Sequence, residues 1–522
     1  MRTKAGMLAS NAAFRFAERI ALTTEAGHQT FRELDQAANR LASGLLSIGL
    51  ASGDRVGVLS HNRAEVMHAW LACERADLVR LVLHSHFDMA THRDTVRHVG
   101  ASAILFDTRF KATLESCRDQ FPGVRHFIAI GDDPPDWAMP LDAVLARGSA
   151  DPLDLDVDED SPNFIQPTTG TTGAPKPWIV TQRSWTAMVN QNLIHLDSFA
   201  TALPPIGPDD VSLHVHALQW ASGGQTLYPY FVRGSRTVLM DDETFDAERL
   251  VATILDEGVT GVLLPAHILA PMLDIVERRG GIPHRLKRLI VFFATPELLT
   301  RTTQLLGPVW CHGYGSTEQG AIGTRLLYEE TIGRPHRLGS VGRGGSPFYE
   351  CSVVDHNGDP VANGRAGEIV VRSAMSNSRY WEMPEKTQAS FFPGGWFRTG
   401  DVGTMDEDGF LYYVDRAKDA VHTTGSVIYP HEIEANLLSH PAVHNVGVVG
   451  LGEAGRQQIV AAVVLKSGQA KSEALRSAIA RLAPVNDGKP IDIRFVDELP
   501  AVLGGAKVQR EVLRERLEME RA

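Results

Sequence analysis

Short apolar runs alternate with segments of helical periodicity between Phe31 and Phe293, and this alternation restricts the fold more than any other feature of the sequence. In the predicted helices apolar residues recur every three or four positions, whereas the predicted strands are short and almost continuously apolar. The predicted helices include residues 31–50 and 247–257, and the predicted strands include 55–60, 78–85, 103–107, 261–265 and 288–293. Such alternation predicts an α/β fold in which helices pack on sheets.

The chain has 522 residues, which is more than one hydrophobic core usually organises, so we expect more than one domain. After Gly339 the pattern changes to strands and turns, which predicts a β-rich subdomain at residues 339–416. Beyond Arg416, strands and helices mix in a unit of plausible domain size. We therefore expect a large N-terminal domain of α/β subdomains at 1–416 and a small α+β C-terminal domain at 417–522.

Charge and composition exclude several classes of protein. The net charge of -12 argues against nucleic acid as a partner, because a phosphate backbone is held mainly by clustered Lys and Arg. The four cysteines form no C-x-x-C pair, which weakens zinc and disulfide interpretations and favours a reducing cytoplasm. The N-terminus has no signal-peptide pattern, and no apolar stretch approaches the roughly 20 residues that span a bilayer. We expect a cytoplasmic protein without a membrane span.

The segment from Thr168 to Lys176 carries the strongest chemical signal. Its glycines permit a tight loop whose backbone N–H groups converge on phosphate oxygens, while its hydroxyls donate and its lysine adds positive charge. The Walker spacing is absent. A flexible surface loop is the alternative interpretation of this segment taken alone.

Four further motifs follow in order. They are Tyr314-Gly315-Ser316-Thr317-Glu318, the segment 395–401 that ends in Asp401, the segment 415–419 that contains Arg416 and Lys418, and the segment 505–510 that contains Lys507. Together with the phosphate-binding loop, these motifs resemble those of the adenylate-forming superfamily, the AMP-binding enzymes that include acyl-CoA synthetases, luciferases and nonribosomal adenylation domains. The resemblance spans residues 168–510, and it implies a small C-terminal domain that moves.

The resemblance assigns nucleotide contacts to particular residues. Tyr314 would face adenine, Gly315 would let the backbone approach the ligand, Thr317 would donate to a phosphate, and Glu318 would bind Mg²⁺. The expected phosphate-binding loop residues are Thr168, Thr169, Gly170, Thr171, Thr172, Gly173 and Lys176. Thr317 and Glu318 are therefore expected to act in catalysis.

The resemblance also assigns the residues near the small domain. Asp401 would accept the ribose hydroxyls together with Arg416, and Lys507 would be the catalytic cation that stabilises charge in adenylation. Lys418 would be the hinge about which the small domain rotates between two half-reactions. Gly425 would leave room for a pantetheine arm.

Two segments of the sequence bear on the acid-binding pocket. Two histidines at strand spacing, His214 and His216, stand where many members have one histidine at the mouth of the acyl pocket, and we favour His216. A metal site and a structural histidine are the competing interpretations. Phe293 and Ala294 lie in a segment that replaces the usual small residues beside the adenine and acyl pockets, so a phenyl ring is expected to shorten the pocket.

Another sequence pattern, Gly450 to Gly455, matches G-x-G-x-x-G, but residues 456–459 lead into a strand rather than a long helix. We therefore reject a dinucleotide site there.

Taken together, the sequence predicts an ATP- and Mg²⁺-dependent acid:CoA ligase that activates a small, aromatic acid as an acyl-AMP. The first alternative is an enzyme that loads a carrier protein. A second is a diazotase-like member that activates nitrite for transfer to an aryl amine, and a third is a catalytically silent binding protein. The sequence leaves open the identity of the acid, the oligomeric state and the pathway.

Overall fold

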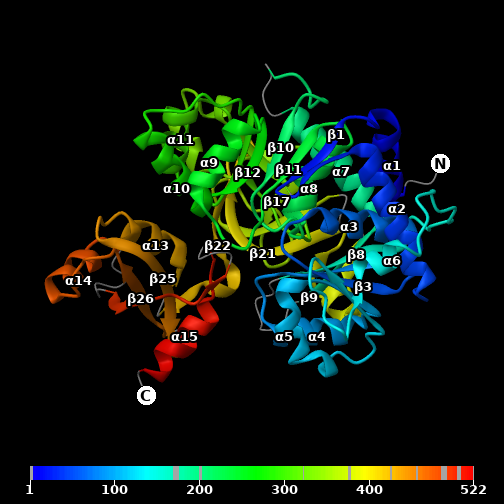
Figure 1. Cartoon of the computed structure of the whole chain (residues 1–522). Coiled ribbons are helices and arrows are strands. Elements are labelled where there is room, and N and C mark those ends of the chain that lie inside the picture. The colour runs from blue at the N-terminus through cyan, green and yellow to red at the C-terminus, as the bar shows by residue number, and fades with distance from the viewer. Residues whose placement is uncertain are drawn as a thin grey trace. The chain divides into compact units, whose positions relative to one another are not determined.

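The computed structural model describes residues 4–168, 176–198, 203–320, 322–373, 378–423, 426–453, 456–483, 491–502 and 507–520. The chain divides into two compact units (Figure 1). The first comprises Met1–Cys351 with Val371–Phe397, and the second comprises Ser352–Val370 with Arg398–Ala522. The boundary expected after residue 416 stays a prediction, and each unit is described by itself.

A largely parallel sheet forms one half of the first unit. Across the described residues its strands run in the order β16 (Arg343–Gly344), β15 (Thr324–Leu327), β14 (Trp310–Tyr314), β13 (Arg288–Phe292), β12 (Gly261–Pro265), β10 (Val211–His214), β11 (Arg236–Leu239), β1 (Ile20–Thr24) and β2 (Gly27–Thr30). Strands β14 to β1 are parallel to one another, and antiparallel strands close both edges.

A second sheet forms the other half of this unit. Its described strands run in the order β19 (Arg379–Tyr380), β9 (Lys176–Thr181), β8 (Pro162–Thr168), β4 (Val79–Leu83), β3 (Arg55–Leu59), β5 (Ala103–Asp107), β6 (His126–Ile130) and β7 (Met139–Pro140). Strands β3, β4 and β5 are buried along nearly their whole length, as expected for parallel strands that helices cover on both faces.

Helices cover the sheets and pack between them. α7 contacts β8 and β9 of one sheet, and α8 contacts β10 and β11 of the other (Figure 1). The helices of this unit are α1 (Ala5–Phe16), α2 (Phe31–Ser47), α3 (Ala64–Ala76), α4 (Met89–Val99), α5 (Lys111–Glu115), α6 (Leu141–Leu145), α7 (Gln182–Asp197), α8 (Ala221–Phe231), α9 (Ala247–Asp256), α10 (Ala266–Arg278), α11 (Pro296–Leu306) and α12 (Pro384–Ala389). The predicted α/β alternation is confirmed, and α2 begins with a capping box between Thr30 and Glu33.

The second unit combines a sheet, in which β20, β21 and β22 pair antiparallel, with an α+β lobe. The sheet, part of which lies in the first unit, contains β17 (Glu350–Val354), β18 (Gly367–Arg372), β20 (Phe391–Phe392), β21 (Trp396–Met405) and β22 (Leu411–Arg416). The lobe contains β23 (Val421–Thr423), β24 (Ser426–Ile428), α13 (Pro430–Leu438), β25 (Val443–Leu451), β26 (Gln458–Leu465), α14 (Glu473–Ala480), β27 (Asp492–Val496), β28 (Ala501–Val502), β29 (Lys507–Val508) and α15 (Arg510–Met519).

The segment that matches G-x-G-x-x-G joins two strands of this lobe. β25 pairs antiparallel with β26 across it, so a strand follows where a dinucleotide site requires a helix. Rejection of that site from the sequence is therefore supported by the fold. Across the described part of the chain, no helix combines the length and the apolar character needed to cross a membrane.

Candidate functional site

The predicted phosphate-binding loop joins two strands of the second sheet. Thr168 ends β8, Lys176 begins β9, and the two residues pair in the antiparallel register. The Thr168 hydroxyl donates to the backbone carbonyl of Lys176 at 3.2 Å. The expected contacts at Thr169, Gly170, Thr171, Thr172 and Gly173 lie outside the described residues. Both ends of the loop are thus held by a β-ladder, one of whose strands also pairs with β4.

The motif from Tyr314 to Glu318 occupies the carboxyl end of β14 and the turn after it. Gln319 anchors this turn, because its side-chain amide donates to the Tyr314 hydroxyl at 3.2 Å and its carbonyl oxygen accepts from Tyr349 at 2.8 Å. Gln319 is buried, whereas Gly315, Thr317 and Glu318 are partly exposed. Gln319 therefore holds the turn in place, while Thr317 and Glu318, the two expected catalytic residues of this motif, remain accessible to solvent.

Within the first unit, Tyr380 links the turn that contains Glu318 to β9, the strand that begins after the phosphate-binding loop. Its hydroxyl donates to Glu318 Oε1 at 3.4 Å, its backbone pairs with Trp178 on β9, and the two rings meet edge to face at 4.8 Å. Burial, together with the charge of Glu318, raises the pKa of Tyr380, so its hydroxyl stays protonated and can donate. Sequence analysis missed Tyr380 because its partner lies 62 residues away and no local motif marks it.

His214 and His216 lie at and just beyond the carboxyl end of β10. The His216 Nε2 lies 3.3 Å from the Ser222 hydroxyl, and the centroids of the two imidazole rings are 6.3 Å apart. Burial lowers the pKa of His214 to about 3 and that of His216 to about 4, so both rings are neutral near pH 7. Among the described residues, neither histidine belongs to a group of three potential metal ligands.

Asn62, which sequence analysis also missed, holds the segment around His216. Its side-chain amide donates to the backbone carbonyls of His216 at 2.9 Å and Met240 at 3.0 Å. Its carbonyl oxygen accepts the backbone N–H of Leu218 at 2.7 Å. Asn62 follows β3 of the second sheet, so this side chain fastens the carboxyl ends of β10 and β11 to the other half of the unit.

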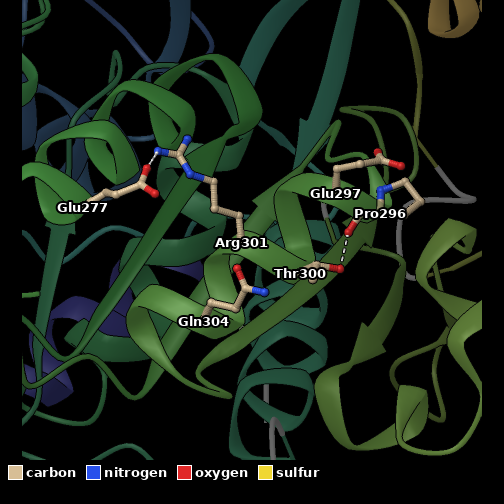
Figure 2. A pocket seen from close by; sticks show the side chains of 6 residues that line it. All are labelled: Glu277, Pro296, Glu297, Thr300, Arg301 and Gln304. Carbon is tan, nitrogen blue, oxygen red and sulfur yellow. Dashed lines mark hydrogen bonds and ion pairs between the residues drawn. The ribbon is translucent and has the colours of Figure 1, made fainter. Parts of the chain in front are cut away.

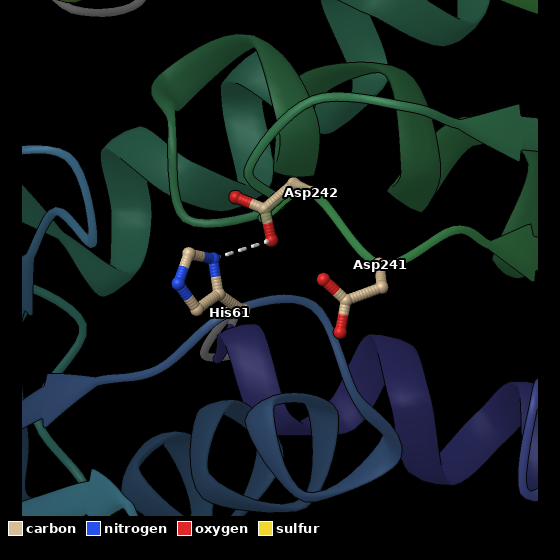
Figure 3. A group of neighbouring side chains, drawn as sticks. All are labelled: His61, Asp241 and Asp242. Atoms are coloured by element: carbon tan, nitrogen blue, oxygen red, sulfur yellow. Dashed lines mark ion pairs between the residues drawn. The ribbon is translucent and has the colours of Figure 1, made fainter. Parts of the chain in front are cut away.

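His61, Asp241 and Asp242 form the group of potential metal ligands in the described chain, with ligand atoms within 4.8 Å of one another (Figure 3). The His61 Nδ1 lies 3.5 Å from Asp242. However, Asp242 already accepts the backbone N–H of Asn62 at 2.6 Å, and Arg109 binds Asp241 at 2.8 Å. The Arg109 guanidinium beside Asp241 repels a second cation. We therefore interpret these three residues as part of the hydrogen-bonded contact that joins the two sheets of the first unit.

Phe293 follows the carboxyl end of β13 in a left-handed conformation, with φ of 60°. For a residue with a side chain, this conformation costs about 1 kcal/mol or more. The next residue, Ala294, donates its N–H to His312 Nε2 at 3.4 Å, while the other nitrogen of His312 lies 3.0 Å from the carbonyl of Ser340. Phe293 is 67% exposed, so the expected shortening of the pocket by its ring stays a prediction.

In the second unit, Asp401 and Arg416 face each other across β21 and β22. Arg416 Nε lies 2.7 Å from Asp401 Oδ1, and Asp401 is buried. Lys418, the expected hinge, forms an ion pair with Glu511 at 3.2 Å. The expected ribose-binding pair is therefore adjacent in the fold, whereas Gly425 lies outside the described residues.

Lys507 begins β29, and the structure describes its backbone only. Three residues later, Arg510 opens α15 and binds three carboxylates: Glu434 at 2.6 Å, Asp419 at 3.1 Å and Asp415 at 3.6 Å. These acids hold Arg510 charged and raise its pKa, although burial opposes this effect. The guanidinium thereby anchors the segment that carries Lys507 to β22 and α13.

A hollow of about 410 Å³ lies between α10 and α11, lined by Glu277, Pro296, Glu297, Thr300, Arg301 and Gln304 (Figure 2). Arg301 is already paired with Asp274 at 2.8 Å and with Glu277 at 2.5 Å. The hollow contains none of the residues expected from the motifs. We therefore do not assign the activity to it.

Two family models and several curated proteins match this chain. Residues 9–381 match the family model of the AMP-binding enzymes, and residues 432–503 match the model of the AMP-binding enzyme C-terminal domain. The chain is 31% identical to the indoleacetate–CoA ligase of Aromatoleum aromaticum, with 98% of this chain and 96% of that protein covered. It is 27% identical to the long-chain-fatty-acid–CoA ligase of Thermus thermophilus, with 94% and 91% covered.

The fold also resembles that of a solved structure, an anthranilate CoA ligase in complex with anthranoyl-AMP. The TM-score is 0.87 at 23% identity, and the alignment covers 99% of this chain and 98% of that one. The curated relatives are named for acids as different as an indole acid and a long-chain fatty acid. The size and polarity of the acid must therefore be sought in the residues of this chain.

Proposed function

Because this chain belongs to the AMP-binding enzyme family and is an AMP-forming acid–thiol ligase, we propose that it joins a small aromatic carboxylic acid to coenzyme A. In the first half-reaction, a carboxylate oxygen attacks the α-phosphorus of ATP, the bond to the β-phosphate breaks, and pyrophosphate leaves. In the second, the thiolate of CoA attacks the acyl carbon of the acyl-AMP, and AMP leaves.

The observation that carries this proposal is the bond from Tyr380 to Glu318. It connects the hairpin of the phosphate-binding loop with the turn that contains Thr317, so both motifs can act on one nucleotide. Glu318 is partly exposed, and the bond that it accepts from another described residue is the long one from Tyr380 at 3.4 Å, which leaves carboxylate lone pairs for a hard cation. Mg²⁺ bound there would neutralise phosphate charge.

In this proposal the other motif residues bind and orient the nucleotide. Asp401 and Arg416 hold the ribose, Tyr314 stacks against adenine, and Thr168 and Lys176 flank the triphosphate. Lys507 brings a positive charge to the carboxylate and the α-phosphate, where two anions must approach each other. A small aromatic acid is supported by the relatives named for indoleacetate and anthranilate.

The direct test measures pyrophosphate release and thioester formation with purified protein. ATP and Mg²⁺ are held constant while benzoates, arylacetates and short aliphatic acids are varied, each with and without CoA. We expect pyrophosphate release that depends on an aromatic acid, and acyl-CoA that accumulates only when CoA is present. AMP formation with an acid but without any thioester would refute CoA as the acceptor.

Replacement of Lys507 by Ala tests the catalytic assignment. We expect the rate of pyrophosphate release to fall by about 10²- to 10³-fold, because a preorganised cation is lost where charge develops in the transition state. ATP binding, measured by calorimetry, should change little. Lys471→Ala is the matched control, since Lys471 forms an exposed ion pair with Asp497 in the same unit. An equal loss in both variants would contradict the assignment.

A further inference from the structure

The two sheets of the first unit carry the expected nucleotide motifs at their carboxyl edges. β3, β4 and β8 are parallel, so the end of β8, where the phosphate-binding loop begins at Thr168, lies at the same edge as the ends of β3 and β4. In the other sheet, β10 to β14 are parallel, so the turn that contains Glu318 lies at the same edge as the ends of β10 and β11. ATP held by both motifs therefore depends on the spacing of these two edges.

Asp242 lies where the two edges meet. It follows β11 of the parallel sheet, and its buried carboxylate accepts the backbone N–H of Asn62, just beyond β3, at 2.6 Å. The same carboxylate accepts the Ser85 hydroxyl at 3.4 Å and lies 3.5 Å from His86 Nε2, and both of these residues follow β4. One side chain of the parallel sheet thus contacts the ends of two strands of the second sheet.

His84 extends this contact to β8. Its Nε2 lies 2.7 Å from the side-chain nitrogen of Gln166, two residues before Thr168. Burial lowers the pKa of His84 to about 3, so the neutral ring can accept this bond. The ring also stacks on Trp220, with 3.9 Å between the centroids. The chain after β4 therefore reaches from Asp242 to the strand that leads into the phosphate-binding loop.

The Asp242 carboxylate is charged in the fold. Burial alone would raise the pKa of Asp242, but its contacts with His61 and His86 and the N–H of Asn62 outweigh burial and hold this pKa well below its usual range. Hydrogen bonds to an ionised acceptor are stronger than those to a neutral one. The contact between the two edges is therefore expected to resist changes in their spacing.

From these contacts we propose that Asp242 is a positioning residue for adenylation, which sets the spacing between the phosphate-binding loop and the turn that contains Glu318. The inference rests on the proposed function, because it concerns the site where ATP would bind. ATP needs both edges at once, since its triphosphate would lie at the loop and its adenine beside Tyr314. AMP lacks the β- and γ-phosphates and depends less on the spacing.

The first experiment measures the affinities for ATP with Mg²⁺ and for AMP by calorimetry. Asp242→Ala should weaken ATP binding by about tenfold, which is the contribution of one charge-assisted hydrogen bond to a phosphate, and should leave AMP binding near the wild-type value. Asp242→Asn keeps an oxygen that accepts the N–H of Asn62, so it should recover most of the ATP affinity. This measurement needs no acid and is independent of the identity of the substrate.

The second experiment separates the two half-reactions. With the best acid, Asp242→Ala should lower the rate of pyrophosphate release by about 10- to 100-fold, because a small misplacement of reacting groups is costly. Thioester formation from preformed acyl-AMP and CoA involves neither the β- nor the γ-phosphate, so its rate should stay near that of the wild-type protein. A purely structural role of Asp242 would lower both rates alike.

Asp210→Ala is the matched control. Asp210 is also a buried carboxylate, which binds Lys287 at 2.9 Å and accepts the N–H of Gly207 at 3.0 Å. It precedes β10 and therefore lies at the opposite edge of the same sheet. Its loss should leave the ratio of the ATP and AMP affinities at the wild-type value.

His84→Phe is a second variant, which keeps Asp242 in place. It removes the bond to Gln166 and retains a ring that can stack on Trp220. We expect it to weaken binding of ATP relative to AMP in the same direction as Asp242→Ala. It decides the question if Asp242→Ala does not fold.

The possible results separate the two proposals. An unchanged ratio of affinities in Asp242→Ala or, where that variant does not fold, in His84→Phe would overturn the inference, as would an equal change in Asp210→Ala. A shifted ratio without turnover of any acid would refute the proposed activity alone. A wild-type protein that binds neither ATP nor AMP would overturn both.

Discussion

The Tyr380 hydroxyl and the Glu318 carboxylate meet although 62 residues separate them in the chain. Tyr380 is itself fixed by strand pairing with β9 and by its contact with the ring of Trp178. A carboxylate that binds a metal depends on such a partner for its orientation. At the scale of single residues, Tyr380 is therefore the group through which the proposed Mg²⁺ site can be tested without removing its ligand.

Replacement of Tyr380 by Phe removes this hydrogen bond and keeps the ring. We expect the Mg²⁺ concentration that gives half-maximal pyrophosphate release to rise about tenfold, because partners of metal ligands typically contribute 10- to 100-fold to metal affinity. The measurement is a Mg²⁺ titration of the initial rate at saturating ATP and acid.

Tyr412→Phe is the matched control for this prediction. Its hydroxyl donates to Asp406 at 3.2 Å in the second unit, and neither residue is an expected ligand of Mg²⁺. The control should show the Mg²⁺ dependence of the wild-type protein. If Tyr380→Phe also keeps it, the bond to Glu318 has no part in metal binding.

Candidate site residues in contiguous motifs could be proposed from the sequence. The residues that hold these segments in place through hydrogen bonds could not. The segments around Thr168, Tyr314 and Asp401 are recognisable because the residues that characterise each motif are neighbours in the sequence. Tyr380, by contrast, acts on a residue distant in sequence, and Asn62 reaches carbonyls 154 and 178 positions away. Only the fold brings such partners together.

Between α3 and α8, a carboxyl group is buried in the helical layer of the first unit. Glu74 on α3 accepts from the Trp70 indole at 3.1 Å and from the Tyr228 hydroxyl of α8 at 2.7 Å. Arg80 lies under the Trp70 ring, 3.9 Å from its centroid. Burial raises the pKa of Glu74 to about 7, although the hydrogen bond from Tyr228 and the charge of Arg80 oppose the shift.

The raised pKa of Glu74 makes stability depend on pH with a defined sign. The folded protein holds this proton up to about pH 7, while the unfolded chain releases it near 4.5. The contribution to the free energy of unfolding is therefore fully present below pH 4.5 and is lost as pH rises through 7, by about 3 kcal/mol in total. Glu74→Gln should remove this dependence, which urea unfolding at a series of pH values would measure.

The informative quantity is the difference between the wild-type protein and Glu74→Gln at each pH, since other groups titrate in both. Glu65→Gln on the same helix is the comparison, because the pKa of Glu65 is lowered rather than raised: burial opposes the shift, but the ion pair with Arg63 outweighs it. Its difference from the wild type should change with pH in the opposite direction. A constant difference for Glu74→Gln would show that Glu74 is ionised in the fold.

Asp415 lies on β22 and contacts both α13 and α15 in the second unit. Its carboxylate accepts the N–H of His431 at 2.7 Å in the first turn of α13 and lies 3.6 Å from Arg510 of α15. Asp415→Ala should lower the free energy of unfolding of the second unit by about 1–2 kcal/mol, as for loss of a helix cap. Calorimetry should show this shift, whereas Glu407→Ala, an exposed residue in the neighbouring turn, should not.

Element boundaries could be predicted closely where periodicity was strong. The strand at 261–265 agrees with β12, and the helix expected at 31–50 ends at Ser47, just before the left-handed Gly49. The order of strands in the sheets could not be read, because pairing of β10 with β12 joins segments that are not adjacent in the chain. The contact of Asp242 with the ends of β3 and β4 was invisible to sequence analysis for the same reason.

Across the whole molecule, neutral buried histidines are concentrated in the first unit. Burial lowers the pKa of these imidazoles to about 3 or 4 in His68, His84, His92, His195, His214, His216 and His312. In the unfolded chain the same rings take up protons below about pH 6.5. Their contribution to stability is therefore present above pH 6.5 and is lost as pH falls toward 4.

We therefore expect the first unit to unfold at progressively lower temperature as pH is reduced from 7.5 to 5, since these histidines outnumber the single raised carboxyl of Glu74. All eight tryptophans of the sequence fall within this unit, so tryptophan fluorescence follows its unfolding alone. His195→Phe should reduce the proton uptake on unfolding near pH 5 by about one proton, because one buried imidazole is removed. A fluorescence melting temperature independent of pH over this range would show that these rings are already protonated or solvated in the folded protein.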